Sequence, residues 1–170
     1  MVVAILFVKC SESKRDALNK SNGSLPNDIF SSANSSFRSS VIKIITYTED
    51  STLISEIMFD TASGKKEGLT KIFYKNGRLK EEGLWLDDKQ SGTWSFYDEL
   101  GRVKSKINFK NDNQDGLSLF YNANGVVLEA TQFKDGKLDG TSTQYYPSGK
   151  KRRLTKWIAG EKQSEQFFSE

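Results

Sequence analysis

The strongest constraint on this chain is a segment that recurs at a fixed spacing. The sequence GLSLFYNANG occupies residues 116–125, and related segments occupy residues 68–77, 92–101 and 140–149. Each segment begins 24 residues after the one before it. Self-similarity at a period of about 20–50 residues is the sequence mark of a repeat architecture, in which one supersecondary unit stacks on the next.

The four copies hold the same kinds of residue at the same positions. Each has a first glycine, an aromatic residue five positions later, a second glycine four positions further on, and a large aromatic residue eight positions beyond that. These structural repeat positions are Gly68, Gly92, Gly116 and Gly140; Phe73, Tyr97, Tyr121 and Tyr145; Gly77, Gly101, Gly125 and Gly149; and Trp85, Phe109, Phe133 and Trp157. We expect the first glycine to begin a strand where the backbone needs positive φ or leaves no room for a side chain.

The residues between the glycines indicate β-hairpins. Asn-Gly at 76–77 and 124–125, and Asp-Gly at 135–136, are dipeptides that favour tight turns with positive φ. Along residues 103–109, Val, Ser, Ile and Phe alternate with Lys, Lys and Asn, the period of a strand with one buried and one hydrated face. The sequence therefore predicts an all-β fold, an elongated single-layer meander of stacked β-hairpin repeats of 24 residues.

The two columns of recurring aromatic residues are predicted to form the core of this sheet. Each buried aromatic side chain contributes about 2–3 kcal/mol of transfer free energy, so a column of them can stabilise a sheet with little other core. The alternative is that the columns form a surface on which a ligand stacks. Tyr74 and Tyr146 recur less regularly, which makes them candidates for an exposed contact patch.

The repeats extend beyond the four clean copies. Residues 41–47 (VIKIITY) are rich in β-branched side chains and predict a strand. Residues 51–68 form an imperfect copy, in which Phe59 takes the place of Trp85 at a spacing of 26 residues. Residues 164–170 (SEQFFSE) form a truncated copy. The predicted repeat domain covers residues 41–170.

Residues 11–40 differ in composition from the repeats. They are rich in Ser and Asn, show no period of 2 or 3.6, and contain too few apolar residues to offset the entropy of ordering. We expect this segment to be a disordered N-terminal tether.

The first ten residues, MVVAILFVKC, combine an apolar run with a cysteine. They resemble the end of a bacterial lipoprotein signal peptide, which implies lipid attachment at Cys10. The protein would then lie in the bacterial cell envelope, lipid-anchored or exported, with the tether lifting the folded domain off a membrane. The alternative is that residues 2–8 form a buried strand of a cytoplasmic protein, since β-branched residues favour strands.

The order of glycine, aromatic pair, glycine-ended turn, apolar residue and aromatic residue resembles the MORN-repeat superfamily. More closely, it is similar to the bacterial MORN variant of YwqK-type proteins. The resemblance covers about residues 45–168 and implies a sheet of β-hairpins. It also implies an interaction role, because some YwqK-type proteins are described as antitoxins and other MORN repeats are associated with membrane lipids or protein scaffolds.

Composition excludes several kinds of catalytic site. The chain has no histidine and one cysteine, which excludes a Ser-His-Asp or Cys-His site, a His-containing zinc site and an internal disulfide. Asp87, Asp88, Asp112 and Asp115 lack the glycine-punctuated ligand order of a calcium loop, and turn formation accounts for them. The sequence predicts a protein that is not an enzyme, with no catalytic residue, metal, cofactor or small-molecule substrate.

One basic cluster lies near the last repeat. It consists of Lys150, Lys151, Arg152, Arg153 and Lys156. These side chains are candidates for contact with an anionic membrane surface. The alternatives are a nucleic-acid backbone, which the net charge of only +3 disfavours, and a solvated cap at the end of the repeats.

Two functions fit these observations. The first is a non-enzymatic protein-interaction or scaffold module of a bacterial envelope lipoprotein, which presents a rigid β surface and edge strands to another protein. The second is a cytoplasmic YwqK-type antitoxin-like protein that binds and occludes a partner toxin by the same surface. Cys10 separates them, because it is lipidated in the first and a free thiol in the second.

Overall fold

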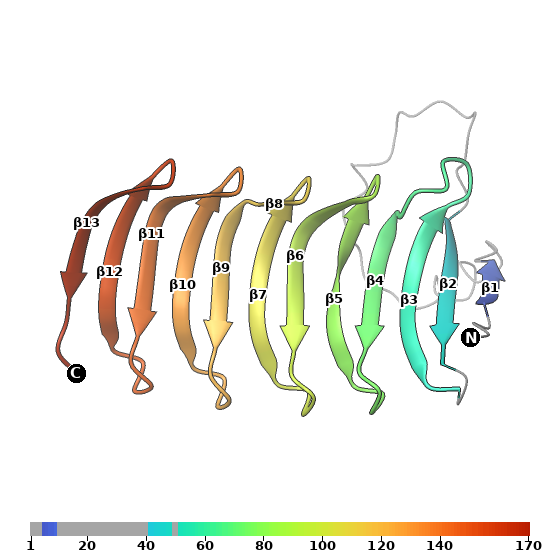
Figure 1. Cartoon of the computed structure of the whole chain (residues 1–170), viewed down its shortest axis with the longest axis horizontal. Helices are drawn as coiled ribbons and strands as arrows, with labels where there is room; N and C mark the ends of the chain where they lie inside the picture. Colours follow the sequence, from blue (N-terminus) through green and yellow to red (C-terminus); the bar gives the residue numbers. More distant parts are fainter. Residues whose placement is uncertain (1–4, 10–40, 49–50) are drawn as a thin grey trace, which may run out of the picture.

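The computed structural model describes residues 5–9, 41–48 and 51–170. These residues form one antiparallel sheet, in which strands that are neighbours in the chain are hydrogen-bonded to each other (Figure 1). The predicted all-β, single-layer meander of hairpin repeats is confirmed.

The strands follow one another in space as they do in the chain. They are β1 (Ile5–Lys9), β2 (Val41–Tyr47), β3 (Leu53–Asp60), β4 (Gly68–Phe73), β5 (Leu79–Leu86), β6 (Lys89–Tyr97), β7 (Val103–Lys110), β8 (Asn113–Gln114), β9 (Gly116–Tyr121), β10 (Val127–Lys134), β11 (Lys137–Tyr145), β12 (Lys151–Ile158) and β13 (Glu161–Phe167). The exception is the two-residue β8, which pairs with β7 while β7 also pairs with β9.

The sheet is one layer thick, so its two sides are two different surfaces. Trp94 in β6 pairs with Ile107 in β7, and the adjacent Ser95 pairs with Lys106. Paired residues of antiparallel strands point to the same side, and successive residues point to opposite sides. We therefore name the surfaces the Trp94 face and the Lys106 face, and assign other side chains to them by pairing and alternation.

The best-buried side chains are mostly small. Thr70 and Ser118 expose 1% of their surface and Thr131 exposes 2%, and Trp94, at 2%, is the one buried hydrophobic residue in the described part of the chain. The two aromatic columns, which the sequence predicts as the core, are half-buried instead. The described residues form no second layer over the sheet, so among them a ring near a strand end is covered only by neighbours on its own face.

The two aromatic columns lie on opposite faces. Tyr97 donates a hydrogen bond from its hydroxyl to Glu82 on the Lys106 face, at 2.8 Å. Trp85, by contrast, pairs with Gly68 and contacts Trp94. The same cross-strand pairing of a large aromatic residue with a first glycine recurs three times along the sheet, as Phe109 with Gly92, Phe133 with Gly116, and Trp157 with Gly140.

Positive φ explains the first glycine of each copy. Gly68 has a φ of 114°, a conformation that side-chain-bearing residues rarely adopt. A Cβ at this position would also lie only 3.1 Å from the Met58 sulfur. The expectation of positive φ at the strand start therefore agrees with the geometry.

The turns differ in part from the sequence prediction. Asp135 and Gly136 both have positive φ, the pattern of a two-residue hairpin turn. In the 76–77 turn only Gly77 has positive φ, because the loop is longer and is closed by Tyr74 N–H donating to the carbonyl of Arg78. The turn after Phe59 is also longer, with Asp60 N–H donating to the carbonyl of Lys65, and this accounts for the spacing of 26.

The structure of residues 5–9 bears on the two alternatives for the N-terminus, a signal peptide or a strand. β1 pairs antiparallel with β2, with Phe7 opposite Ile44, so residues 5–9 form a strand at the edge of the sheet. The lipidation candidate Cys10 and the predicted tether at 11–40 lie outside the described residues. Within the described ranges there is no helix of the length and hydrophobicity needed to cross a bilayer.

Trp94 organises the middle of the sheet. Its ring packs edge-on against Trp85 at 5.3 Å and against Phe109 at 6.4 Å between centroids. A Cβ built on Gly83 would overlap this ring, so the indole occupies the space above Gly83. Two repeats further on, the equivalent residues are Thr131 and Ser142, whose hydroxyls are hydrogen-bonded at 2.8 Å.

Replacing the Gly83–Trp94 pair by the Thr–Ser pair found two repeats further on tests this packing. Gly83→Thr alone should cost about 1–3 kcal/mol of unfolding free energy, because the new side chain overlaps the indole ring. Combined with Trp94→Ser, it recreates the hydroxyl pair. The double variant should therefore be at least about 1 kcal/mol more stable than the sum of the two single variants' changes in unfolding free energy predicts. Urea unfolding of all four proteins measures this coupling. Strict additivity would show that the two residues do not pack as described.

Candidate interaction surface

The two faces of the sheet carry different charges. Alternation places every lysine of strands β4–β11 on the Lys106 face or at its margin. These residues are Lys71, Lys80, Lys89, Lys104, Lys106, Lys110, Lys134 and Lys137. Over the same strands, the only charged residues of the Trp94 face are Glu81 and Glu129. The Trp94 face is thus weakly acidic over these strands, and the Lys106 face, where the lysines outnumber Glu82 and Asp139, is basic.

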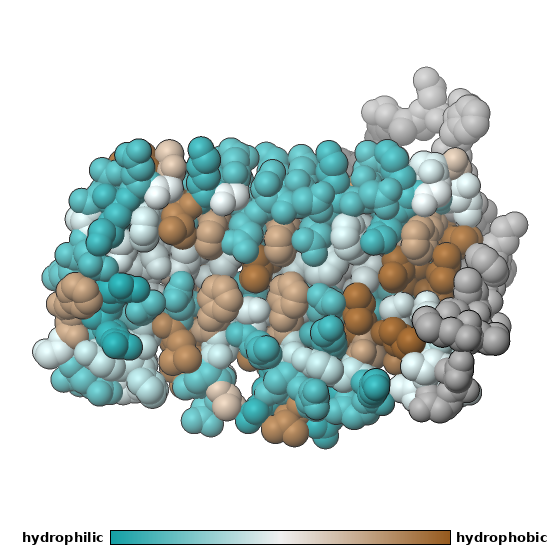
Figure 2. Space-filling view, viewed as in Figure 1, coloured by the Kyte–Doolittle hydropathy of each residue, from teal (hydrophilic) through white to brown (hydrophobic). Residues whose placement is uncertain are grey.

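Figure 2 shows how hydropathy is distributed over one broad side of the sheet. Hydrophobic side chains form separate patches across the middle strands, among hydrophilic ones. The edge that carries the two-residue turns is nearly continuous hydrophilic surface. This side of the sheet is therefore mixed in hydropathy, with apolar patches bordered by polar side chains.

A row of five residues crosses the Trp94 face at right angles to the strands. Consecutive cross-strand pairs link Glu81 to Phe96, Phe96 to Ser105, Ser105 to Phe120, and Phe120 to Glu129. We call it the acidic-aromatic row. Phe120 is 39% exposed, whereas Ser105, at the centre, is buried at 8%. The order of residue types is symmetric: a glutamate stands at each end of the row, a phenylalanine stands next to each glutamate, and the serine is at the centre.

Hydrogen bonds fix the carboxylate at one end of this row. Glu129 accepts from the Thr131 hydroxyl at 2.9 Å through Oε1, and from the Gln144 amide at 3.2 Å through Oε2. Both partners are neutral. Among the described residues neither Glu81 nor Glu129 forms an ion pair, so the face keeps two uncompensated negative charges.

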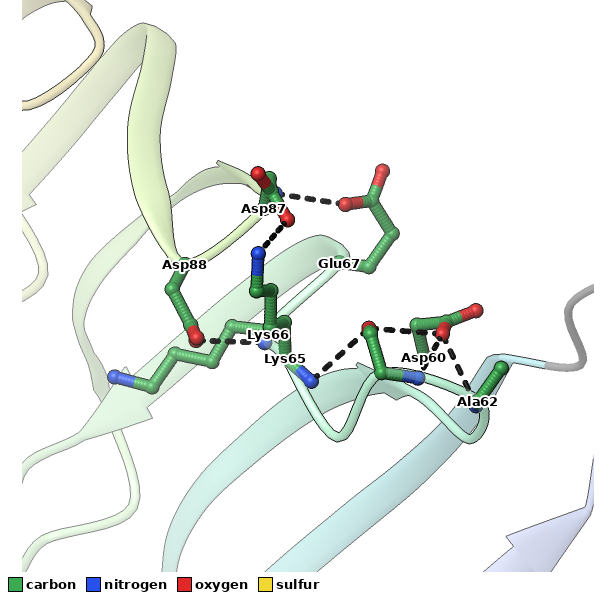
Figure 3. Close-up of polar contacts among 8 residues, drawn as sticks. Asp60, Ala62, Lys65, Lys66, Glu67, Asp87 and Asp88 are labelled. Carbon is green, nitrogen blue, oxygen red and sulfur yellow. Dashed lines mark hydrogen bonds and ion pairs between the residues drawn. The ribbon is translucent and has the colours of Figure 1, made fainter.

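Aspartates and glutamates along this edge of the sheet bind neighbouring turns. Glu67 accepts a hydrogen bond from the Asp87 backbone N–H, and Asp88 accepts one from the Lys66 N–H, each at 2.8 Å (Figure 3). The Lys65 ammonium also bonds to the Asp87 carboxylate, at 2.5 Å. These carboxylates therefore have structural partners, consistent with their interpretation as turn-forming residues.

The same arrangement recurs along this edge. Asp112 accepts from the Gln90 N–H at 2.8 Å, and Asp115 accepts from the Asp135 N–H at 3.2 Å. Asp115 is also hydrogen-bonded to the Lys134 ammonium at 3.0 Å. The bond to Lys134, followed by the backbone bond from Asp135, lowers the pKa of Asp115.

The tyrosines predicted as an exposed patch have a structural role instead. The Tyr74 hydroxyl donates to the carbonyl of Tyr97 at 2.8 Å, and the Tyr146 hydroxyl donates to the carbonyl of Phe168 at 3.0 Å. Both side chains are half-buried. Each links the turn of one copy to the strand end of the next, so the expectation of exposure is wrong.

The basic cluster is divided between the two faces. Arg153 lies on the Trp94 face, where it pairs with Gln144 and bonds to Glu165 at 3.2 Å. Alternation places Arg152 and Lys156 on the Lys106 face, and the Arg152 guanidinium lies 5.9 Å from the Tyr146 ring centroid. Lys150 lies in the preceding turn, and Lys151 begins β12 and is exposed. The five cations do not form one surface.

These features define a class of protein: an open, single-layer β-repeat whose two broad faces are chemically distinct. The MORN repeat variant model matches residues 66–87, 90–111, 114–135 and 138–157, each of which spans one hairpin of the sheet. The matches cover half of the chain, and the chain belongs to the MORN repeat variant family. Proteins with these repeats are generally protein- or membrane-interaction modules and typically are not enzymes. No curated protein matches the chain as a relative.

The acidic-aromatic row was not identified from the sequence, although a signal for it is present. Phe96 and Phe120 are separated by 24 residues, and Glu81 and Glu129 by 48, one and two repeat lengths. The four positions become neighbours only when the register of every strand pair is known, because a shift of one residue moves a side chain to the other face.

Acid unfolding tests the turn carboxylates. The lowered pKa of Asp115 means that its contribution to stability is present above the unfolded-state value of about 3.9 and is lost as the pH falls through the folded-state value. We expect Asp115→Asn to be less stable than the wild type near pH 6 and to lose less stability between about pH 5 and pH 2. Urea midpoints across this range give the comparison.

Glu99→Gln serves as the control, since that carboxylate accepts no hydrogen bond within residues 51–170. Equal pH dependence of Asp115→Asn and the wild type would contradict the assignment.

Proposed function

We propose that this protein is a non-enzymatic interaction scaffold of the bacterial cell envelope, held by a lipid on Cys10, which presents the Trp94 face to another protein. The observation that carries the proposal is the uncovered aromatic surface on that face. Phe120 is 39% exposed and Phe167, at the far end of the sheet, is 70% exposed. Partly exposed aromatic side chains on a rigid sheet supply contact area with little loss of conformational entropy on binding.

The Lys106 face supports the anchoring part of the proposal. A surface with eight lysines, extended by Arg152 and Lys156, fits the anionic headgroups of a membrane. Each lysine or arginine near such a surface contributes about 1 kcal/mol. Contact through the Lys106 face would leave the Trp94 face turned away from the bilayer and open to a partner.

The second candidate is a cytoplasmic antitoxin-like protein that uses the same face against a toxin. It is favoured by the pairing of β1 with β2, which places residues 5–9 within the sheet of the uncut chain. Signal-peptide cleavage before Cys10 would remove β1 and leave β2 at the edge. The two candidates thus differ in whether β1 belongs to the mature protein.

Fractionation of cells that express the chain, followed by intact-mass analysis, separates these candidates. We expect the protein in the detergent phase, with a mature N-terminus at a diacylated or triacylated Cys10 and with Cys10→Ser retained as an uncleaved precursor. A soluble chain that starts at Met1 or Val2 and has a free Cys10 thiol would contradict the anchor and support the cytoplasmic candidate.

Vesicle binding tests the Lys106 face. Lys104→Glu combined with Lys106→Glu should weaken co-sedimentation with phosphatidylserine-containing vesicles at least about tenfold, because several kcal/mol of electrostatic attraction is lost. The control is Lys75→Glu combined with Lys162→Glu, which changes the net charge equally at sites away from this face. Equal losses in both double variants would show that only net charge matters.

A further inference from the structure

We propose that the acidic-aromatic row binds an extended protein segment with two lysine or arginine side chains about six residues apart and apolar residues between them. The inference rests on the proposed role as a protein-interaction scaffold, and it specifies the surface used and the chemistry of the partner. The row consists of Glu81, Phe96, Ser105, Phe120 and Glu129, as defined above.

Uncompensated charge is the first argument. Six ion pairs join described residues elsewhere in the chain, whereas Glu81 and Glu129 form none. Both side chains are half-buried, beside phenyl rings. A carboxylate in such a setting gains from a cation that arrives with its own hydrogen-bond donors, because pairing is stronger where water is partly excluded.

The spacing of the two carboxylates is the second argument. Glu81 is on β5 and Glu129 is on β10, four strand steps apart through β6, β7 and β9. At about 4.8 Å per step the separation is about 19 Å. An extended chain advances about 3.3 Å per residue, so about six residues span this distance.

The two phenylalanines determine what lies between the cations. Phe96 is half-buried, and Phe120 exposes 39% of its surface beside Glu129. Apolar side chains of the bound segment would cover these rings, and the aliphatic stems of the two basic residues would lie along their edges. A guanidinium or ammonium near a phenyl ring adds a cation–π contribution.

The charge pattern also identifies the class of partner. A phosphate-rich surface, either nucleic acid or anionic lipid, would be repelled by carboxylates at both ends of the row. The lysines of strands β4–β11 all lie toward the opposite face, and Arg153, two strands beyond Glu129 on the same face, is paired with Glu165. A basic, apolar polypeptide segment satisfies both the carboxylates and the rings.

A peptide library provides a direct test. Random 12-residue peptides displayed on phage are selected on the immobilised full chain, and enriched sequences are synthesised and measured by fluorescence anisotropy. We expect enrichment of two Lys or Arg residues five to seven positions apart with apolar residues between them. Glu81→Gln combined with Glu129→Gln, which keeps the shape of both side chains, should weaken binding at least tenfold.

Two control variants locate the binding. Glu82→Gln removes a carboxylate from the Lys106 face one residue away and should leave the affinity within about twofold of the wild type. Phe120→Ser should weaken binding, since it removes the exposed ring. Urea midpoints of all variants, together with far-ultraviolet circular dichroism, show whether each one is folded.

The outcomes separate this inference from the proposed function. The inference would be overturned if the binding of the selected peptides is weakened by Phe120→Ser but the peptides lack paired cations, or if their binding is unchanged by loss of both carboxylates. Either result would still support a Trp94 face that binds protein. Peptides that are insensitive to all Trp94-face variants would overturn both. If Glu82→Gln weakens peptide binding as much as the double variant does, the effect is one of overall charge, and the inference is contradicted.

Discussion

The main-chain hydrogen bonding between consecutive strands is the interaction on which the rest of this structure depends. Among the residues that the structure describes, no second layer of helices or strands holds one hairpin against the next. Every residue's face, neighbour and exposure therefore follows from strand register. The first glycines, the paired aromatic rings and the turn carboxylates all act at the ends of strands, where they fix that register from one copy to the next.

The architecture was predictable because it depends on short-range patterns. The period of 24, the alternation around Ile107 and the glycine positions require only residues close in sequence, and together they specify a meander of hairpins. Burial was not predictable in the same way. Large aromatic residues are normally the core, but on an open sheet the best-covered positions are in the middle of the strands, where Thr70, Ser118 and Thr131 lie.

The candidate site shows a sharper limit of sequence reasoning. The basic cluster around Arg152 is contiguous in sequence, yet alternation distributes it over both sides of the sheet. The acidic-aromatic row has the opposite character, since its members are far apart in sequence and contiguous in space. Irregularities of register at Phe96–Tyr97 and between Glu82 and Leu84 have to be known before such a row can be recognised.

The modular build has a consequence for how a binding surface of this kind can change. Each 24-residue unit contributes two strands, so duplication or loss of one unit between Glu81 and Glu129 would change their separation by about 10 Å and leave each local environment intact. The number of repeats therefore sets the distance between two such charged side chains. New partner spacings become accessible through whole-unit duplication, without redesign of any individual contact.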